Sequence, residues 1–121
     1  ALGVTMIESI ITFFQCLSLE TVHRFYHDCL GLELLKDQGV CRIYKTLSGA
    51  VGFCTHLERT SSSNIICFVL KDRQTVDEYY EKVRDFGIEI LTKPTEKEEF
   101  AIYQFFANDM EGNKVEFQCF L

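Results

Sequence analysis

FYHDCLGLEL, residues 25–34, joins the end of an amphipathic helix pattern to a glycine and an apolar–Glu–apolar strand pattern. A second segment, YYEKVRDFGIEI at residues 79–90, has the same order of features. Gly31 and Gly87 stand where a left-handed helix exit is expected in each segment. Self-similarity of this kind predicts that the chain contains two copies of one structural unit.

Each copy contains one helix pattern. Apolar residues recur at three- and four-residue steps through residues 19–30 and 76–86, which is typical of a helix with one buried face. Side chains that can cap a helix N-terminus precede both stretches. The candidate starts are Ser18 or Thr21 for the first helix, and Asp72 or Thr75 for the second.

Strand-like segments flank each helix, with one before it and three after it. In the first half they are residues 7–16, 32–36, 40–46 and 50–56. In the second half they are residues 64–70, 88–92, 100–107 and 114–120, and residues 93–99 are expected to form an exposed loop. The order predicts an α+β fold class, with two βαβββ modules whose helices lie on one face of mixed sheets.

The domain organisation follows from length and from one polar run. A chain of 121 residues is the size of one domain, so residues 1–121 are expected to form a single domain. The polar run at residues 61–64 separates a first module, about residues 6–57, from a second module, about residues 64–121.

Composition and charge exclude several classes of partner. Hydrophobic residues make up 47% of the chain, which is enough for a folded core. The formal net charge is −6 and no Lys/Arg cluster occurs, so nucleic acid and anionic membrane surfaces are not expected partners. The longest apolar run, residues 10–17, is too short to span a bilayer. No leader pattern is visible, so a cytoplasmic location is expected.

The six cysteines form no CxxC pair, so a zinc knuckle is not expected. Most of them lie in apolar, strand-like runs. Buried free thiols are therefore expected, with a framework of three disulfides as the alternative. The positions are Cys16, Cys29, Cys41, Cys54, Cys67 and Cys119.

The last strand shows clear alternation between its two faces. Val115, Phe117 and Cys119 form an apolar set that is expected to pack on a helix. The intervening residues are Lys114, Glu116 and Gln118. In a curved sheet this second set faces the concave side, whereas in an ordinary antiparallel strand it faces solvent.

Two motifs resemble those of a known superfamily. Residues 25–34 resemble the "FYxxxLGxxx" helix-end signature of the vicinal oxygen chelate superfamily. Residues 109–117, DMEGNKVEF, resemble its closing "DPDGNxxEF" signature, with Met110 in place of the usual proline. This superfamily includes glyoxalase I, fosfomycin- and bleomycin-resistance proteins and extradiol dioxygenases. The paired βαβββ order also matches it over essentially the whole chain.

The resemblance implies a curved mixed sheet around a cavity, with helices on the outer face, and often a homodimer. In metal-dependent members, four ligands come from the first and last strands of the modules. Carried over by position, the ligand positions fall on Ile11, near Phe53, and on Ile65 and Glu116. Isoleucine and phenylalanine offer no lone pair, and one carboxylate gives weak binding, so no metal cofactor is expected. A register error would bring in other donors nearby, which are Gln15, Thr55, His56 and Asn64.

The same resemblance assigns residues to a mostly apolar ligand cavity with a few polar groups, which is typical of small-molecule sites. The expected ligand-binding residues are Phe13, Gln15, Phe53, Thr55, Cys67, Lys114, Glu116 and Gln118. Glu116 is the candidate catalytic residue, acting either as a hydrogen-bond anchor for a cationic or amide group or as a general base.

One further pair of residues has metal-ligand spacing. His23 and His27 are one turn apart on the first predicted helix, and Asp28 is adjacent. That spacing can hold zinc. It is also typical of a solvated polar helix face, and this is the interpretation we favour from the sequence.

Three functional hypotheses follow from these patterns. The first is metal-independent binding of a small organic molecule in an apolar cavity. The second is a metal-dependent lyase, isomerase or transferase of glyoxalase type, in which Glu116 helps to move a proton. The third is a structural or interaction role, with a pocket filled by some of the eleven phenylalanines. Whether the protein is an enzyme is left open.

Overall fold

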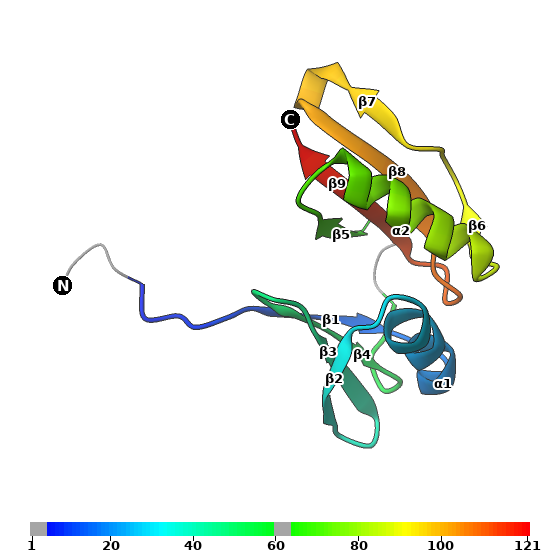
Figure 1. Ribbon diagram of the computed structural model, residues 1–121. Helices are drawn as coiled ribbons and strands as arrows, with labels where there is room; N and C mark the ends of the chain where they lie inside the picture. Colours follow the sequence, from blue (N-terminus) through cyan, green and yellow to red (C-terminus); the bar gives the residue numbers. More distant parts are fainter. Residues whose placement is uncertain (1–4, 60–63) are drawn as a thin grey trace. The chain divides into compact units, whose positions relative to one another are not determined.

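A computed structural model describes residues 5–59 and 64–121 of the chain. The chain divides into two compact units, Ala1–Arg59 and Thr60–Leu121 (Figure 1). Among the described residues, no helix has both the length and the apolar character needed to span a bilayer.

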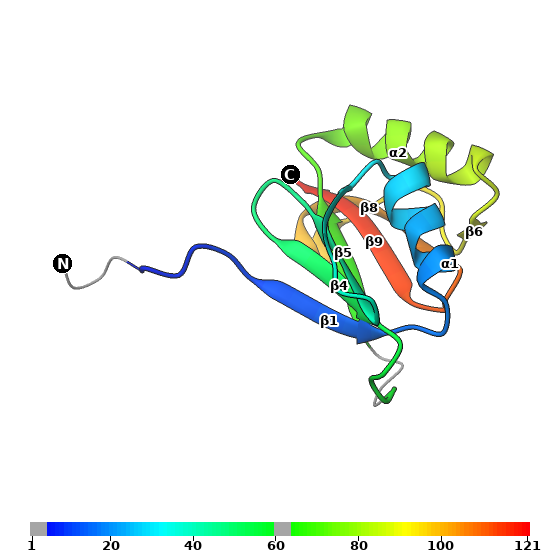
Figure 2. The ribbon, with the colours of Figure 1, turned by 90° about the horizontal axis from the view of Figure 1, so that it is seen from below.

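The first unit holds one helical segment and a four-stranded sheet. The sheet order is β1-β4-β3-β2, and the first strand runs parallel to the last, as seen for β1 and β4 in Figure 2. The remaining pairs are antiparallel. The elements are β1 (Ile11–Gln15), α1 (Leu19–His23), the π-helix η1 (Arg24–Cys29), β2 (Glu33–Asp37), β3 (Cys41–Lys45) and β4 (Ala50–Cys54).

The second unit repeats this order around a five-stranded sheet, in which the path is β5-β9-β8-β6 and β7 also pairs with β8. Its first strand again runs parallel to its last, β5 to β9. The elements are β5 (Ile65–Val69), α2 (Arg73–Asp85), β6 (Glu89–Ile90), β7 (Thr95–Lys97), the short 3₁₀ helix η2 (Glu98–Phe100), β8 (Ile102–Asn108) and β9 (Lys114–Phe120). Two mixed sheets with few helices confirm the predicted α+β class.

Both helices begin at one of the predicted capping residues. The Ser18 Oγ accepts a hydrogen bond from the backbone N–H of Thr21 at 3.2 Å. The Asp72 carboxylate accepts one from the backbone N–H of Thr75 at 2.8 Å. These bonds satisfy amide groups that have no partner inside the helix. The helix exits also match the prediction, because Gly31 and Gly87 have φ angles of 77° and 90°.

Aromatic rings join each helix to its sheet. In the first unit, the ring of Tyr26 lies 4.5 Å from the ring of Phe53 and 6.2 Å from that of Tyr44. All three side chains are fully buried. In the second unit, the rings of Phe105 and Phe117 stack at 4.8 Å on the face that α2 covers (Figure 1). Each helix therefore buries its aromatic stripe against one face of one sheet.

Two expected segment boundaries are corrected by the structure. The first strand was expected over residues 7–16, but β1 is shorter and begins at Ile11. Residues 93–99 were expected to form a loop, yet they include β7, which adds to β8 through an antiparallel register. The charged sequence of β7, TEK, gave no strand signal because all three of its side chains are exposed.

Phe53 was expected to face a ligand cavity, and the structure shows that this prediction is wrong. The Phe53 side chain is 0% exposed and packs under η1 against Tyr26. Its register partner on β1, Phe14, stacks on it at 5.9 Å. The open face of the sheet carries Phe13 and Gly52 instead. The predicted assignment of β4 residues to faces was off by one residue. The reason is that β4 (AVGFC) is apolar throughout, so alternation does not indicate which face the helix covers.

Paired truncations of two neighbouring phenylalanines test this assignment of faces. We expect Phe53→Ala to lower the free energy of unfolding by about 3–5 kcal/mol, the usual cost of deleting a buried ring. Phe13 is 45% exposed, so Phe13→Ala is expected to cost less than half as much. Urea denaturation of both variants measures the difference. Equal losses would contradict the assignment.

Candidate functional site

The face of the second sheet opposite α2 carries the polar residues predicted for the site. Glu116 and Gln118 on β9 lie beside Cys67 and Val69 on β5 through the parallel register. Tyr79 of α2 packs on Phe117, which points to the other face. The alternation read from the last strand is therefore correct: Val115, Phe117 and Cys119 are buried, and Lys114, Glu116 and Gln118 lie on the open face.

The side chain of Cys67 is hydrogen-bonded to those of Glu116 and Gln118. Partial burial raises the pKa of the Cys67 thiol to about 12, and the negative charge of Glu116 and its hydrogen bond to the thiol add to the shift. The thiol therefore stays protonated at neutral pH and donates to the carboxylate. Such a thiol is a poor nucleophile.

Gln104 on β8 adds a polar side chain that the sequence analysis did not single out. It pairs with Gln118 in the antiparallel register, so both lie on the face opposite α2. Gln104 is 1% exposed, and its Oε1 has no hydrogen-bond partner within residues 5–59 and 64–121. A buried acceptor without a partner is uncommon and costs free energy. The signal in the sequence was a lone polar residue inside the apolar run IYQFFA.

We refer to Cys67, Gln104, Glu116 and Gln118 as the polar cluster. Apolar side chains on the same face surround it, because β5 contributes Ile65 and Val69 and β8 contributes Phe106. The predicted ligand residue Lys114 lies at its edge, with Nζ 4.5 Å from the centroid of the Phe106 ring. The open face thus combines a few directed polar groups with an apolar border.

The open face of the first sheet is shaped by Gly52. A Cβ atom at this position would come within 2.5 Å of the Phe13 ring, so the ring lies directly over the glycine. Gln15 is half-buried on this face, and its Nε2 donates to the carbonyl of Cys16 at 3.0 Å. Thr55 follows the end of β4, is exposed and donates to the carbonyl of Val40 at 3.4 Å.

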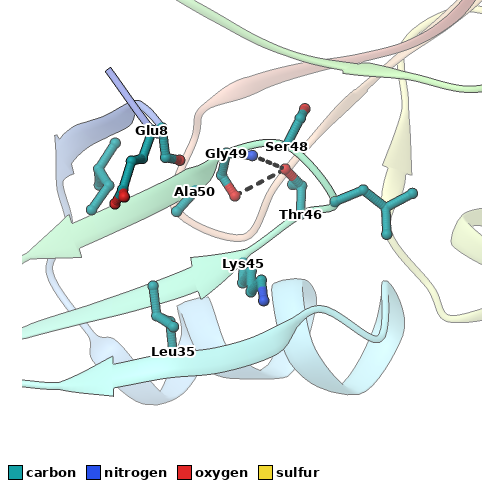
Figure 3. A pocket seen from close by; sticks show the side chains of 10 residues that line it. Glu8, Leu35, Lys45, Thr46, Ser48, Gly49 and Ala50 are labelled. Atoms are coloured by element: carbon teal, nitrogen blue, oxygen red, sulfur yellow. Dashed lines mark hydrogen bonds between the residues drawn. The ribbon is translucent and has the colours of Figure 1, made fainter. Parts of the chain in front are cut away.

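A hollow of about 330 Å³ lies elsewhere in the first unit, beside the β3–β4 turn (Figure 3). The hydroxyl of Thr46 holds this turn through two 3.0 Å bonds to Gly49, one to its N–H and one to its carbonyl. The hollow is lined by residues 8–9, Ile11, Leu35 and residues 45–50. None of the predicted ligand residues Phe13, Gln15, Phe53 and Thr55 lines it. That the predicted residues of the two halves share one cavity stays a prediction.

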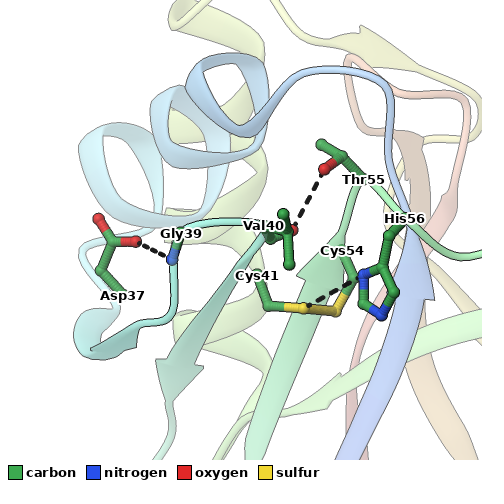
Figure 4. Close-up of a disulfide and its surroundings, with 7 residues drawn as sticks. All are labelled: Asp37, Gly39, Val40, Cys41, Cys54, Thr55 and His56. Atoms are coloured by element: carbon green, nitrogen blue, oxygen red, sulfur yellow. Dashed lines mark hydrogen bonds between the residues drawn. A yellow bond between two sulfur atoms is a disulfide. The ribbon is translucent and has the colours of Figure 1, made fainter.

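Two of the cysteines are bonded, which corrects the expectation of free thiols. Cys41 and Cys54 face each other in the β3–β4 register and form a disulfide (Figure 4). His56 lies next to it, with Nδ1 3.9 Å from the Sγ of Cys41. Cys16, Cys29 and Cys119 are buried as expected, whereas Cys67 is a free thiol on an exposed residue.

Comparison with known proteins identifies the superfamily of this chain. The sequence profile of the Glyoxalase/Bleomycin resistance protein/Dioxygenase superfamily matches residues 11–117. The chain belongs to this superfamily. The match confirms the resemblance drawn from the helix-end and closing motifs, and no curated protein matches the sequence.

Solved structures of superfamily proteins share the fold. A glyoxalase/bleomycin resistance protein/dioxygenase from Alicyclobacillus acidocaldarius has a TM-score of 0.78 at 17% identity, covering 93% of this chain and 91% of its own. A lactoylglutathione lyase from Agrobacterium tumefaciens has a TM-score of 0.77 at 21% identity, with coverages of 97% and 95%. Identities this low establish the common fold alone.

The side chains at the carried-over ligand positions do not form a donor set for a divalent metal ion. Two of the carried-over positions, Ile11 and Ile65, have no lone pair, and Phe53 is turned to the helix. Among residues 5–59 and 64–121, Glu116 belongs to neither of the two groups of three metal-ligating side chains. A single carboxylate leaves most of a coordination sphere to water.

The raised pKa of Cys67 leads to a prediction about its reactivity. With a pKa of about 12, roughly one thiol in ten thousand is ionised at about pH 8, so native Cys67 is expected to alkylate slowly although it is exposed. Glu116→Gln removes the neighbouring charge, lowers the pKa of Cys67 and accelerates its reaction with iodoacetamide. Site-resolved mass spectrometry measures the rate.

The matched control for this experiment is Glu81→Gln, which removes a carboxylate from the exposed side of α2 and is expected to leave the rate unchanged. Rapid alkylation of Cys67 in the native, unmodified chain would contradict the assigned environment.

Proposed function

We propose that this protein binds a small organic molecule without a metal ion, and that the polar cluster of the second sheet holds the polar part of that ligand. The observation that carries the proposal is the Oε1 of Gln104, which is buried beside a row of polar side chains and has no hydrogen-bond partner in the described part of the chain. A ligand that brings a hydrogen-bond donor satisfies this acceptor and offsets the cost of burying it.

The chemistry of the cluster defines the kind of ligand. The Glu116 carboxylate and the Gln104 Oε1 are acceptors on the neighbouring strands β9 and β8. Glu116 pairs with Phe106, and Gln104 is the next residue along β8 that points to the same face. Two acceptors favour a ligand with N–H donors, such as an amine or an amide. The apolar border formed by Ile65, Val69 and Phe106 favours an aromatic or aliphatic body.

Binding without chemical conversion is the activity that these residues support best. The thiol of Cys67 is protonated, which argues against its use as a nucleophile. Likeness to a lactoylglutathione lyase raises glyoxalase-type catalysis as an alternative, but Ile11, Phe53 and Ile65 stand at or near positions that the superfamily resemblance assigns to metal ligands. The homodimer and the cytoplasmic location stay predictions.

A thermal-shift experiment on the metal-stripped chain tests the proposal. Ligands that bind the folded state raise the Tm in proportion to RT ln(1 + [L]/Kd). We expect saturable shifts with aromatic amines or amides, and a loss of affinity of at least about 10-fold in Glu116→Gln. Glu81→Gln serves as the control and retains binding. A stoichiometric divalent ion whose binding requires Glu116 would overturn the proposal.

A substitution at Gln104 separates binding from stability. Gln104→Leu replaces an acceptor that lacks a partner among the described residues by an apolar group of similar size, so the free energy of unfolding is expected to be retained or to rise by up to about 1 kcal/mol. The affinity for the same amine or amide should fall, because the ligand loses an acceptor. Urea denaturation and titration give the two values. A large loss of stability would show that Gln104 has a structural role instead.

A further inference from the structure

A cluster of metal-ligating side chains lies on the exposed side of the first helix, where α1 passes into η1. His23, His27 and Asp28 each offer one ligand atom, and these atoms lie within 4.8 Å of one another. The Nε2 of His23 is 4.0 Å from the Oδ1 of Asp28. The two imidazole rings stack with centroids 4.5 Å apart. The sequence pattern was interpreted as a solvated polar face, and the structure adds the convergence of all three groups.

The wide turn of η1 explains this convergence. In a regular α-helix, residues five apart point to different sides, because a turn contains 3.6 residues. Here the backbone N–H of Leu30 donates to the carbonyl of Phe25 at 3.0 Å, a five-residue spacing. That spacing brings Asp28 round to the side of His23, while His27 lies one turn away on the same side. Turns of this kind occur frequently at functional sites.

Hydrogen bonds orient both imidazole rings. The Nδ1 of His27 lies 2.9 Å from the carbonyl oxygen of Leu32. A carbonyl only accepts, so Nδ1 carries the proton and Nε2 keeps its lone pair. The Nδ1 of His23 is 3.0 Å from the hydroxyl of Tyr44, which is fully buried. Metal-binding histidines commonly have such a partner on the second ring nitrogen.

The backbone that carries the cluster is held firmly on its sheet. Phe25, Tyr26 and Cys29 of η1 are each no more than 1% exposed. The Asp28 side chain, at 51% exposure, is free to rotate toward the rings. The cluster thus combines two oriented ligands with one adjustable carboxylate.

We propose that His23, His27 and Asp28 form a binding site for a divalent transition metal of the Zn²⁺ type, with the fourth position left to water. Two imidazole nitrogens and a carboxylate are a normal ligand set for this ion. Tetrahedral geometry needs ligand atoms about 3.4 Å apart, so a rotation of the Asp28 side chain closes the site. The proposal does not rest on the proposed function, since Glu116 lies in the other unit.

The second group with metal-ligand spacing, Cys41, Cys54 and His56, provides an internal comparison. Its two sulfurs are joined in a disulfide, so they are not available as thiolates. While this disulfide is intact, Zn²⁺ is expected to bind at the cluster of His23, His27 and Asp28 and not at His56.

Isothermal titration of the full chain with Zn²⁺ tests the site, with the disulfide intact and reductant omitted. We expect one ion per chain and a loss of affinity of at least about 10-fold in His23→Gln and in His27→Gln. His56→Gln makes the same chemical change at an exposed histidine elsewhere and should bind as the unmodified chain does. Far-UV circular dichroism checks that each variant is folded.

Tyr44→Phe tests the orienting hydrogen bond separately. It leaves all three ligands in place and is expected to weaken Zn²⁺ binding by about 10-fold. Absence of binding in the unmodified chain, or full affinity in folded His23→Gln and His27→Gln, would overturn the proposal. Loss of binding in His56→Gln would place the ion at His56 and would likewise overturn the proposal. Glu116→Gln should leave Zn²⁺ affinity unchanged, which keeps this test separate from that of the proposed function.

Discussion

Burial of an aromatic helix stripe against one face of a small sheet is the constraint on which both units depend. In the first unit, Tyr26 packs against both Phe53 and Tyr44. In the second, Tyr79 packs on Phe117 and Tyr80 packs on Phe105. Because successive residues of a strand point to opposite faces, covering one face determines which side chains are left on the other. The polar cluster and the Phe13–Gly52 contact both lie on faces left open in this way.

The parallel pairing of β5 with β9 brings the polar side chains of the second sheet together. It sets Cys67 beside Glu116 and joins them to Gln118, although about fifty residues of chain separate the two strands. The antiparallel neighbour β8 then brings in Gln104. The Oε1 of Gln104 has no hydrogen-bond partner among the described residues, and the rest of the unit offsets the free energy this costs. Such costs concentrate at functional sites. A ligand donor is the simplest group to relieve this cost.

Sequence patterns succeeded where one face differs strongly from the other. In β9 (KVEFQCF), strict alternation identified both faces correctly. Helix ends were also identified, because capping and positive φ favour particular residue types: the starts at Ser18 and Asp72 and the exits at Gly31 and Gly87. In β4, every residue is apolar or glycine, so the face of Phe53 was assigned wrongly. The charged strand β7 was missed because its pairing with β8, and not its own sequence, makes it a strand.

The sequence by itself determined the two-module repeat, the α+β class, the helix starts and exits, and the polar face of the last strand. These depend on local periodicity and on the conformational preferences of single residues. The tertiary structure decided the rest: the contact of Cys67 with Glu116, the burial of Gln104, the Cys41–Cys54 bond and the approach of Asp28 to two histidines. Each of these needs strand register or a widened helical turn, which arise from the balance of contacts over the whole unit and leave no pattern in the local sequence.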